Sequence, residues 1–280
     1  MSAADGDFAA RYGRWAVVAG SSEGLGAAFA DEAAARGLDV VLVARRQGAL
    51  EETAARIRAE RGVEARTVVA DLADPDAPAR VFAATDDLEV GLFIYNAAAS
   101  AQGPFVEVEL EPLLTNIAVN VTAPTVLTHT YGRRMKERGR GGIALVSSMA
   151  ALQGTKVFAA YAAAKSYELI LGEGLWDELR DHGVDAVGYV VGATATPTML
   201  ATRGLDADAP AEQTRMDAGD GRPIDPRTPQ AVARALYDVL GTGPRGYSHP
   251  DDQRHAEHGA TLPRGDVVSA MGKITSQFWE

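Results

Sequence analysis

The sequence predicts an α/β protein: a doubly wound parallel sheet with helices on both faces, built as a single domain. Three observations carry this prediction. Short β-branched apolar runs alternate with longer, Ala-rich stretches of helical period, which indicates repeated strand, helix and strand units. Most of the runs are apolar without alternation, as in strands covered on both faces. No stretch of linker composition separates two cores.

Six runs are predicted as strands, at residues 15–19, 40–44, 65–70, 90–95, 143–147 and 184–191. The stretches between them are predicted as crossover helices, at 24–36, 49–61, 75–84, 112–138 and 158–182. Two later helices are expected, at 228–240 and 265–278. Because each strand is followed by a helix long enough for a crossover, all six strands are expected to run parallel.

Three segments do not follow the alternating pattern. Residues 1–13 are predicted to be an N-terminal tail, with the domain over 14–280. Residues 196–226, rich in Ala, Asp, Gly, Arg and Pro, are too long for an ordinary connection and are predicted to form a lid that orders over a bound substrate. Residues 247–280 form an atypical C-terminal segment in which one helix is predicted.

Composition excludes several classes of function. The chain has no cysteine, so it has no disulfide, thiolate nucleophile or cysteine-ligated metal. Its net charge of −11 would repel a phosphate backbone, so no nucleic-acid partner is expected. The first 14 residues have no apolar run, so neither a signal peptide nor a membrane span is expected. A cytoplasmic protein without a membrane partner is the default expectation.

A glycine-rich turn follows the first predicted strand and leads directly into an Ala-rich helix. It consists of Gly20, Ser21, Ser22, Glu23, Gly24, Leu25 and Gly26. Glycine allows the chain to turn sharply, to approach a pyrophosphate closely and to aim the free N–H groups of the helix at the phosphates. The turn predicts a dinucleotide site, and a plain tight turn is the alternative.

The residues beyond the second and third strands indicate which dinucleotide. Arg45 lies where such a site reads the adenosine ribose, and a 2′-phosphate suits arginine. NADP(H) is therefore preferred, and NAD(H) is possible. Ser21 and Ser22 could add hydroxyl donors, and Asp71 could accept from adenine. Glu23 would oppose the phosphate only if its carboxylate pointed inward.

A second constellation joins Ser148, Tyr161 and Lys165. Tyr161 and Lys165 are four residues apart in a predicted helix and so share one face. An ammonium beside a tyrosine favours the phenolate and lowers a pKa that is ordinarily about 10. Taken alone, such a pair is usually only a surface contact, but Ser148 ends the fifth strand, where doubly wound sheets hold their ligands.

Further motifs accompany these residues in a consistent order. They are the pair Asp71 and Leu72, the run Asn96, Ala97 and Ala98, then Asn120, the pair Ser147 and Ser148, and Gly192 with Thr196. In order and spacing the chain resembles the short-chain dehydrogenase/reductase family from about residue 14 to 199. The resemblance implies a Rossmann-type fold, a nicotinamide cofactor, and a homodimer or homotetramer formed through the helices at 112–138 and 158–182.

The resemblance also implies roles for individual residues. Ser148 polarises the substrate carbonyl, and Tyr161 transfers the proton. Lys165 lowers the tyrosine pKa and binds the nicotinamide ribose, and Asn120 anchors a proton relay through water. Thr196 is implied to hold the carboxamide. The expected cofactor-binding residues are Gly20, Ser21, Ser22, Gly24, Leu25, Gly26, Arg45, Asp71, Leu72, Asn96, Ala97, Tyr161, Lys165, Gly192, Thr194 and Thr196.

The chain departs from the family pattern at several points. Ala98 replaces a glycine and could shift the backbone if that glycine has positive φ, and Val191 replaces a proline. The family's common final strand is missing from the sequence pattern. Asn116 is expected at the surface. His255 and His258 are expected to be solvated, and no metal site is predicted.

The predicted function is interconversion of a ketone or aldehyde with an alcohol. Neighbours of the site are mainly apolar, and no arginine is evident there to bind a carboxylate or phosphate, so a neutral, rather hydrophobic substrate is expected. These neighbours are Ala150, Leu152, Phe158, Met199 and Leu200. Two alternatives stay open: a cofactor-binding sensor or scaffold without catalysis, and an epimerase or dehydratase that regenerates its cofactor.

Overall fold

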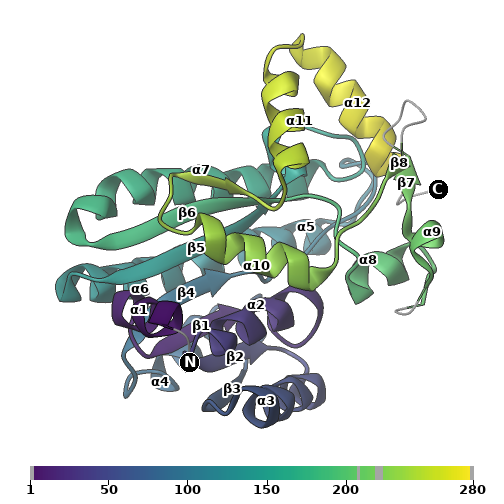
Figure 1. Cartoon of the computed structure of the whole chain (residues 1–280). Helices are drawn as coiled ribbons and strands as arrows, with labels where there is room; N and C mark the ends of the chain where they lie inside the picture. Colours follow the sequence, from purple (N-terminus) through teal and green to yellow (C-terminus); the bar gives the residue numbers. More distant parts are fainter. Residues whose placement is uncertain (1–2, 207–208, 218–222, 278–280) are drawn as a thin grey trace.

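The centre of the molecule is a seven-stranded parallel sheet of order β3-β2-β1-β4-β5-β6-β9 (Figure 1). The computed structural model describes residues 3–206, 209–217 and 223–277. The strands are β1 (Trp15–Ala19), β2 (Asp39–Ala44), β3 (Ala65–Val69), β4 (Val90–Tyr95), β5 (Gly141–Ser148), β6 (Val184–Val191) and β9 (Arg245–Tyr247). Strand order reverses between β1 and β4, which creates a crevice at their carboxyl ends.

Helices cover both faces of the sheet. One face packs against α1 (Ala3–Tyr12), α2 (Gly24–Ala35), α3 (Gln47–Arg61) and α10 (Pro229–Val239). The other packs against α4 (Ala77–Ala83), α6 (Ala123–Arg138) and α7 (Ala159–Leu179). Residues of β1, β2 and β4 alternate between these two cores, which explains why these strands are apolar throughout. The predicted fold class is confirmed.

All six predicted strands are present, with ends that differ from the prediction by at most two residues. The seventh strand, β9, pairs with β6 through Gly188 and Arg245, so the expectation of a missing final strand is wrong. Three residues are too few to show a period of two in the sequence. The strand forms because the edge of β6 is available to it.

The predicted helix at 112–138 consists of three parts. Helix α5 (Leu110–Ile117) leads into a π-helical turn, η1 (Ala118–Thr122), and then into α6. The π turn contains Asn120. Such turns occur frequently at functional sites, because the extra residue per turn displaces the local backbone.

The predicted tail at 1–13 contains α1, whose last residue, Tyr12, has an exposed fraction of only 2%. Its hydroxyl donates to Asp185, and its ring packs 4.5 Å from that of Phe8. Phe8 and Tyr12 lie four residues apart and so form one apolar face, which attaches this segment to the sheet. The expectation of a tail is therefore wrong for the described residues 3–12.

The C-terminal segment holds two helices, α11 (Pro250–Ala260) and α12 (Arg264–Ser276), of which only the second was predicted. They form a pair that rises from one end of the sheet beside α7 (Figure 1). The predicted lid contains α8 (Pro197–Thr202), α9 (Ala211–Thr214) and the two-stranded hairpin of β7 (Met216–Asp217) and β8 (Pro223–Ile224). Residues 207–208, 218–222 and 278, which belong to predicted elements, lie outside the described residues.

Candidate active site

A cleft of about 1920 Å³ lies at the carboxyl ends of the strands. The segments that follow β1, β2, β4 and β6 line one part of it, together with the end of β5. The described parts of the lid and helices α11 and α12 line the rest. A groove of this size at a topological switch point can hold a dinucleotide and a second molecule.

The glycine turn has the shape that the sequence predicts. Gly20 and Gly24 have φ of 82° and 56°, which favour glycine. A Cβ at Gly26 would lie 1.9 Å from the carbonyl oxygen of Gly20, so no side chain fits there. Asn96 donates from Nδ2 to the same Gly20 oxygen at 3.0 Å and thereby fixes the turn. Ala97 packs directly over Gly20.

Ser21 belongs beneath this turn and does not line the cleft. It is fully buried, and its hydroxyl donates to the carbonyl of Val18 at 2.9 Å and accepts from the N–H of Val43 at 3.0 Å. These bonds join β1 to β2. The structure therefore gives Ser21 a structural contact in place of the expected phosphate contact, whereas Ser22 does line the cleft.

Two arginines lie at the end of β2. Arg46 pairs with Glu23 at 2.6 Å, which neutralises the carboxylate that could have repelled a phosphate. Arg45 is mostly exposed and lies 3.9 Å from Asp71. All four side chains belong to residues that line the cleft. Arg45 thus has the looser partner and is the better candidate to bind an anionic ligand.

Segment 96–100 runs along the floor of the cleft after β4. Asn120 binds Ala99 twice, accepting from its N–H at 3.0 Å and donating to its carbonyl at 2.6 Å. Asn116 is buried and donates to the same carbonyl at 2.9 Å, so the expectation that it lies at the surface is wrong. The two asparagines are four residues apart and share one face. Ala98 does not have positive φ, so its methyl group introduces no strain there.

Ser148, Tyr161 and Lys165 all line the cleft. Ser148 is the last residue of β5, and its hydroxyl accepts from the N–H of Ala150 at 3.2 Å. Tyr161 lies in the first turn of α7, and the ammonium of Lys165 lies 5.9 Å from the centre of its ring. Lys165 is almost completely buried and donates to the carbonyl of Val146 at 2.9 Å. The three residues that the sequence predicts as a group therefore line the same cleft.

Val157, just before α7, has φ of 70°. It is the one non-glycine residue with positive φ in the part of the chain that the structure describes. The left-handed region is costly for a β-branched residue, and such strain is concentrated at functional sites. Its carbonyl accepts from the N–H of Gly103 at 2.9 Å, which connects the start of α7 to the loop after β4.

The comparisons with known proteins agree with this geometry. Residues 14–205 match the family model for short chain dehydrogenases. The chain belongs to the short-chain dehydrogenase/reductase family. It is therefore an oxidoreductase in class.

Individual relatives cover nearly the whole chain. A 7beta-hydroxysteroid dehydrogenase from Clostridium sardiniense is 32% identical over 277 residues, which is 96% of this chain and 98% of the relative. A structure described under 7beta-hydroxysteroid dehydrogenase stereoselectivity is 28% identical with a TM-score of 0.85, and covers 94% of this chain and 98% of that one. A short-chain dehydrogenase from Sphingobium yanoikuyae in complex with NADPH is 28% identical with a TM-score of 0.74, over 88% and 93%.

The loop after β6, which contains the sequence-predicted residues Gly192, Thr194 and Thr196, is bound to the C-terminal segment. The N–H of Gly192 donates to the hydroxyl of Ser248 at 3.0 Å, and that hydroxyl donates to Asp252 at 2.6 Å. A Cβ at Gly192 would lie 2.5 Å from the carboxylate of Asp252. Thr196 caps α8 by accepting from Met199, and Thr194 also lines the cleft. The sequence pattern gave no signal for Ser248 or Asp252.

The substrate side of the cleft is only partly as expected. Ala150, Leu152, Phe158 and Met199 line it, whereas Leu200 is buried outside it. Three arginines also line the cleft, which the sequence analysis did not expect, although each of them already has a partner. They are Arg227, Arg245 and Arg264, which bind Asp251, Glu173 and the carbonyl of Leu152 respectively. All three lie outside the strands and helices that the sequence predicts.

His255 and His258 also line the cleft, on α11. Among the residues that the structure describes, no group of three or more His, Asp or Glu side chains is placed to hold a metal ion. Within the same residues, none of the helices combines the length and the apolar character needed to cross a membrane.

Sequence reasoning missed Glu168, the partner of Lys165. Its Oε2 lies 2.7 Å from the ammonium of Lys165, and its side chain has an exposed fraction of 0%. Burial raises the pKa of Glu168 to about 7, although the neighbouring Lys165 acts to lower it. The only signal in the sequence is a single acid three residues after Lys165 on an otherwise apolar helix face.

Proposed function

We propose that this protein is an NADP(H)-dependent oxidoreductase that interconverts a ketone or aldehyde with an alcohol on a neutral, bulky and hydrophobic molecule. The observation that carries the proposal is the meeting of Ser148, Tyr161 and Lys165 in one cleft with the glycine turn. Each has the chemistry that carbonyl reduction needs: a hydrogen-bond donor for the oxygen, a proton donor and a fixed cation.

The residues present fit the nicotinamide cofactor. A side chain at Gly20 or Gly26 would meet backbone atoms, which keeps the turn open for phosphates, and Arg45, which lines the cleft, would bind a 2′-phosphate. The cofactor, when bound, supplies or accepts the hydride. In reduction, Tyr161 donates its hydroxyl proton to the carbonyl oxygen while Ser148 donates a hydrogen bond to the same oxygen. Lys165 stabilises the phenolate that remains and binds the ribose.

Asn120 is the proposed anchor of the proton relay. Both ends of its side-chain amide are occupied by Ala99, so its side chain holds the backbone in place. We propose that the backbone of the π turn binds the water of the proton relay, and that the side chain of Asn120 keeps this backbone in position. Replacement of Asn120 by Ala is expected to lower kcat without removing cofactor binding.

Preference for NADP(H) is supported by the two arginines after β2 and by the NADPH complex of the relative described above. Charged hydrogen bonds to a phosphate contribute about 1.5 to 3 kcal/mol each. We therefore expect Arg45→Ala to lose about tenfold or more of its selectivity for NADPH, measured as the ratio of kcat/KM values for NADPH and NADH on one ketone. An NADH preference of the wild-type enzyme would contradict this part of the proposal.

A steroid-sized secondary alcohol is the proposed substrate class. Relatives named 7beta-hydroxysteroid dehydrogenase support it, as does the apolar lining by Leu152, Phe158 and Met199. A substrate screen read by nicotinamide absorbance tests the proposal. Turnover of hydroxysteroids or other bulky neutral alcohols is expected, and turnover of phosphorylated or carboxylated compounds alone would refute it.

The catalytic assignment is tested by Tyr161→Phe, which removes the proton donor and little else. We expect carbonyl reduction to fall about 10²- to 10⁴-fold while NADPH still binds. Near wild-type activity would overturn the mechanism and favour a cofactor-binding scaffold. Net conversion of substrate without cofactor consumption would instead favour the epimerase or dehydratase alternative.

Association through α5 and α7 is the proposed route to a dimer or tetramer. Leu110, Leu114 and Ile117 of α5 are exposed, as is Ile170 of α7. Exposed large apolar side chains in this number on neighbouring helices indicate an interface. Sedimentation at micromolar concentration should show an oligomer, and a monomer would exclude it.

The lid at 196–226 is proposed to order over the cleft when cofactor and substrate bind. Its described residues Thr202, Met216 and Ile224 already line the cleft. Protease cleavage within the lid should slow when both ligands are present, and equal rates would count against closure.

A further inference from the structure

Helix α7 carries one buried acid whose presence the fold does not explain. The buried residues of its sheet-facing side are otherwise Ala, Gly and Leu, apart from Lys165 and Glu168. Spacing of three residues places these two side chains on the same face. The helix would pack against the sheet without either charge, so packing does not require Glu168.

Stability does not explain Glu168 either. Its Oε2 accepts from Lys165 at 2.7 Å, but its Oε1 is buried and has no hydrogen-bond partner in the described structure. Removing a carboxylate from water is costly, and a single partner rarely compensates for that cost. Buried ion pairs can often be replaced by apolar residues without loss of stability. A carboxylate in this position therefore indicates a function.

The geometry shows what Glu168 does to Lys165. An ammonium has three N–H donors. One binds the carbonyl of Val146 on β5, and a second binds Glu168. These two contacts hold the nitrogen between strand and helix. One donor is left for the cleft, on the side where the ring of Tyr161 lies 5.9 Å away.

We propose that Glu168 is a positioning residue for the reaction, which acts by holding the ammonium of Lys165 in place and by partly offsetting its charge at Tyr161. The inference rests on the proposed roles of Lys165 and Tyr161. Under this proposal, alcohol oxidation depends on three groups: the phenol of Tyr161, the ammonium of Lys165 and the carboxylate of Glu168.

The groups around this pair are few. In the described structure, α7 contributes Lys165 and Tyr161, and β4 contributes Tyr95, a buried phenol whose pKa is raised by burial and then by the charge of Glu168. Strand β5 contributes the uncharged carbonyl of Val146. The negative charge of Glu168 thus acts on the phenol of Tyr95 as well as on the ammonium of Lys165.

The test is the pH dependence of kcat/KM for alcohol oxidation. Glu168→Gln keeps the size and an acceptor oxygen but removes the charge. In the variant the ammonium of Lys165 acts on the reaction without an opposing charge, so the midpoint of the profile should move to lower pH. Asp177→Asn is the matched control, because Asp177 is an exposed acid of the same helix paired with Arg180. Its midpoint should equal that of the wild type.

A second variant separates position from charge. Glu168→Asp keeps the charge but withdraws the carboxylate by one methylene, so the midpoint should stay while KM for NADP⁺ rises severalfold. A wild-type or raised midpoint in Glu168→Gln overturns the inference. If Glu168→Gln does not fold, a wild-type KM for NADP⁺ in Glu168→Asp overturns it. An active Tyr161→Phe enzyme instead overturns the proposed function itself, so the two failures can be told apart.

Discussion

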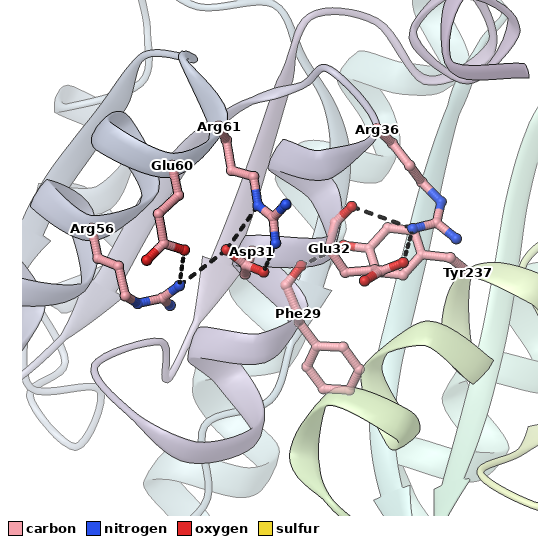
Figure 2. Close-up of polar contacts among 8 residues, drawn as sticks. All are labelled: Phe29, Asp31, Glu32, Arg36, Arg56, Glu60, Arg61 and Tyr237. Atoms are coloured by element: carbon pink, nitrogen blue, oxygen red, sulfur yellow. Dashed lines mark hydrogen bonds and ion pairs between the residues drawn. The ribbon is translucent and has the colours of Figure 1, made fainter. Parts of the chain in front are cut away.

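Charged side chains are held in opposite ways on the two sides of the sheet. On one side, Asp31 of α2 accepts from Arg56 and Arg61 of α3, at 3.1 and 2.7 Å (Figure 2). Burial acts to raise the pKa of Asp31, but Arg61 and Arg56 hold it below its usual value. On the other side, the carboxyl of Glu168 has the single cation Lys165, and burial raises its pKa to about 7.

A second group of contacts lies beside the first and includes a third element. Arg36, the residue after α2, pairs with Glu32 of α2, and its guanidinium lies 4.5 Å from the centre of the Tyr237 ring of α10. The hydroxyl of Tyr237 donates to the carbonyl of Phe29 at 2.7 Å (Figure 2). Each charge drawn there has a partner, and the side chains of Arg56, Glu60 and Arg61 are partly exposed. These contacts join α2 to α3 and α2 to α10, with little gain from each exposed pair.

The difference supports the proposed role of Glu168. A charge kept for structure lies where water can replace its partner. The Lys165 and Glu168 pair lies where water cannot, and one carboxylate oxygen has no partner in the described structure. Three substitutions test this contrast.

Lys165→Met should have the largest effect on stability. At pH 8 it leaves the carboxylate of Glu168 buried without its cation, which costs about 3–5 kcal/mol in the free energy of unfolding. At pH 5 Glu168 is protonated, so the loss should be clearly smaller. Urea unfolding at both pH values measures the two losses. Equal losses would mean that Glu168 is not the group that responds.

Glu168→Gln should have an intermediate effect that depends on pH. Between pH about 4.5 and about 7 the folded wild type retains a proton that the unfolded chain releases, so its stability falls as pH rises. The glutamine variant lacks this term. The free energy of unfolding of the variant should therefore rise by about 3 kcal/mol relative to that of the wild type between these two pH values. Parallel curves for the two proteins would contradict the raised pKa.

Asp31→Asn should have the smallest effect. The two arginines it binds stay solvated, so the free energy of unfolding is expected to fall by less than about 1 kcal/mol. Salt at about 1 M should reduce the difference further, because it screens exposed charges. A loss above about 2 kcal/mol would place this network in the same class as the buried pair.

The parts of the fold that were predicted correctly depend on local patterns. Strands β1 to β6 are mainly apolar runs, and the glycine turn is contiguous in the chain. The pair Tyr161 and Lys165 is set by the helix period, and Ser148 by a strand end. Each of these could be read within a window of a few residues.

The parts that were missed depend on distant contacts. Strand β9 pairs with the edge of β6, and the side chain of Asn116 is bound by the carbonyl of Ala99, 17 residues away. Ser21 is aimed away from the cleft by backbone groups of two strands. Arg245 reaches the cleft through a strand that the pattern did not show. No local periodicity of the sequence predicts such long-range contacts.

Val157 has a further consequence for the start of α7. Its left-handed backbone costs about 1–3 kcal/mol, a cost borne four residues ahead of Tyr161. A glycine there would remove the strain and also the side chain that keeps this turn in one shape. The folded protein is thus less stable by this amount at the turn that precedes Tyr161. Laboratory selection for heat tolerance would be expected to change this residue early, at the expense of turnover.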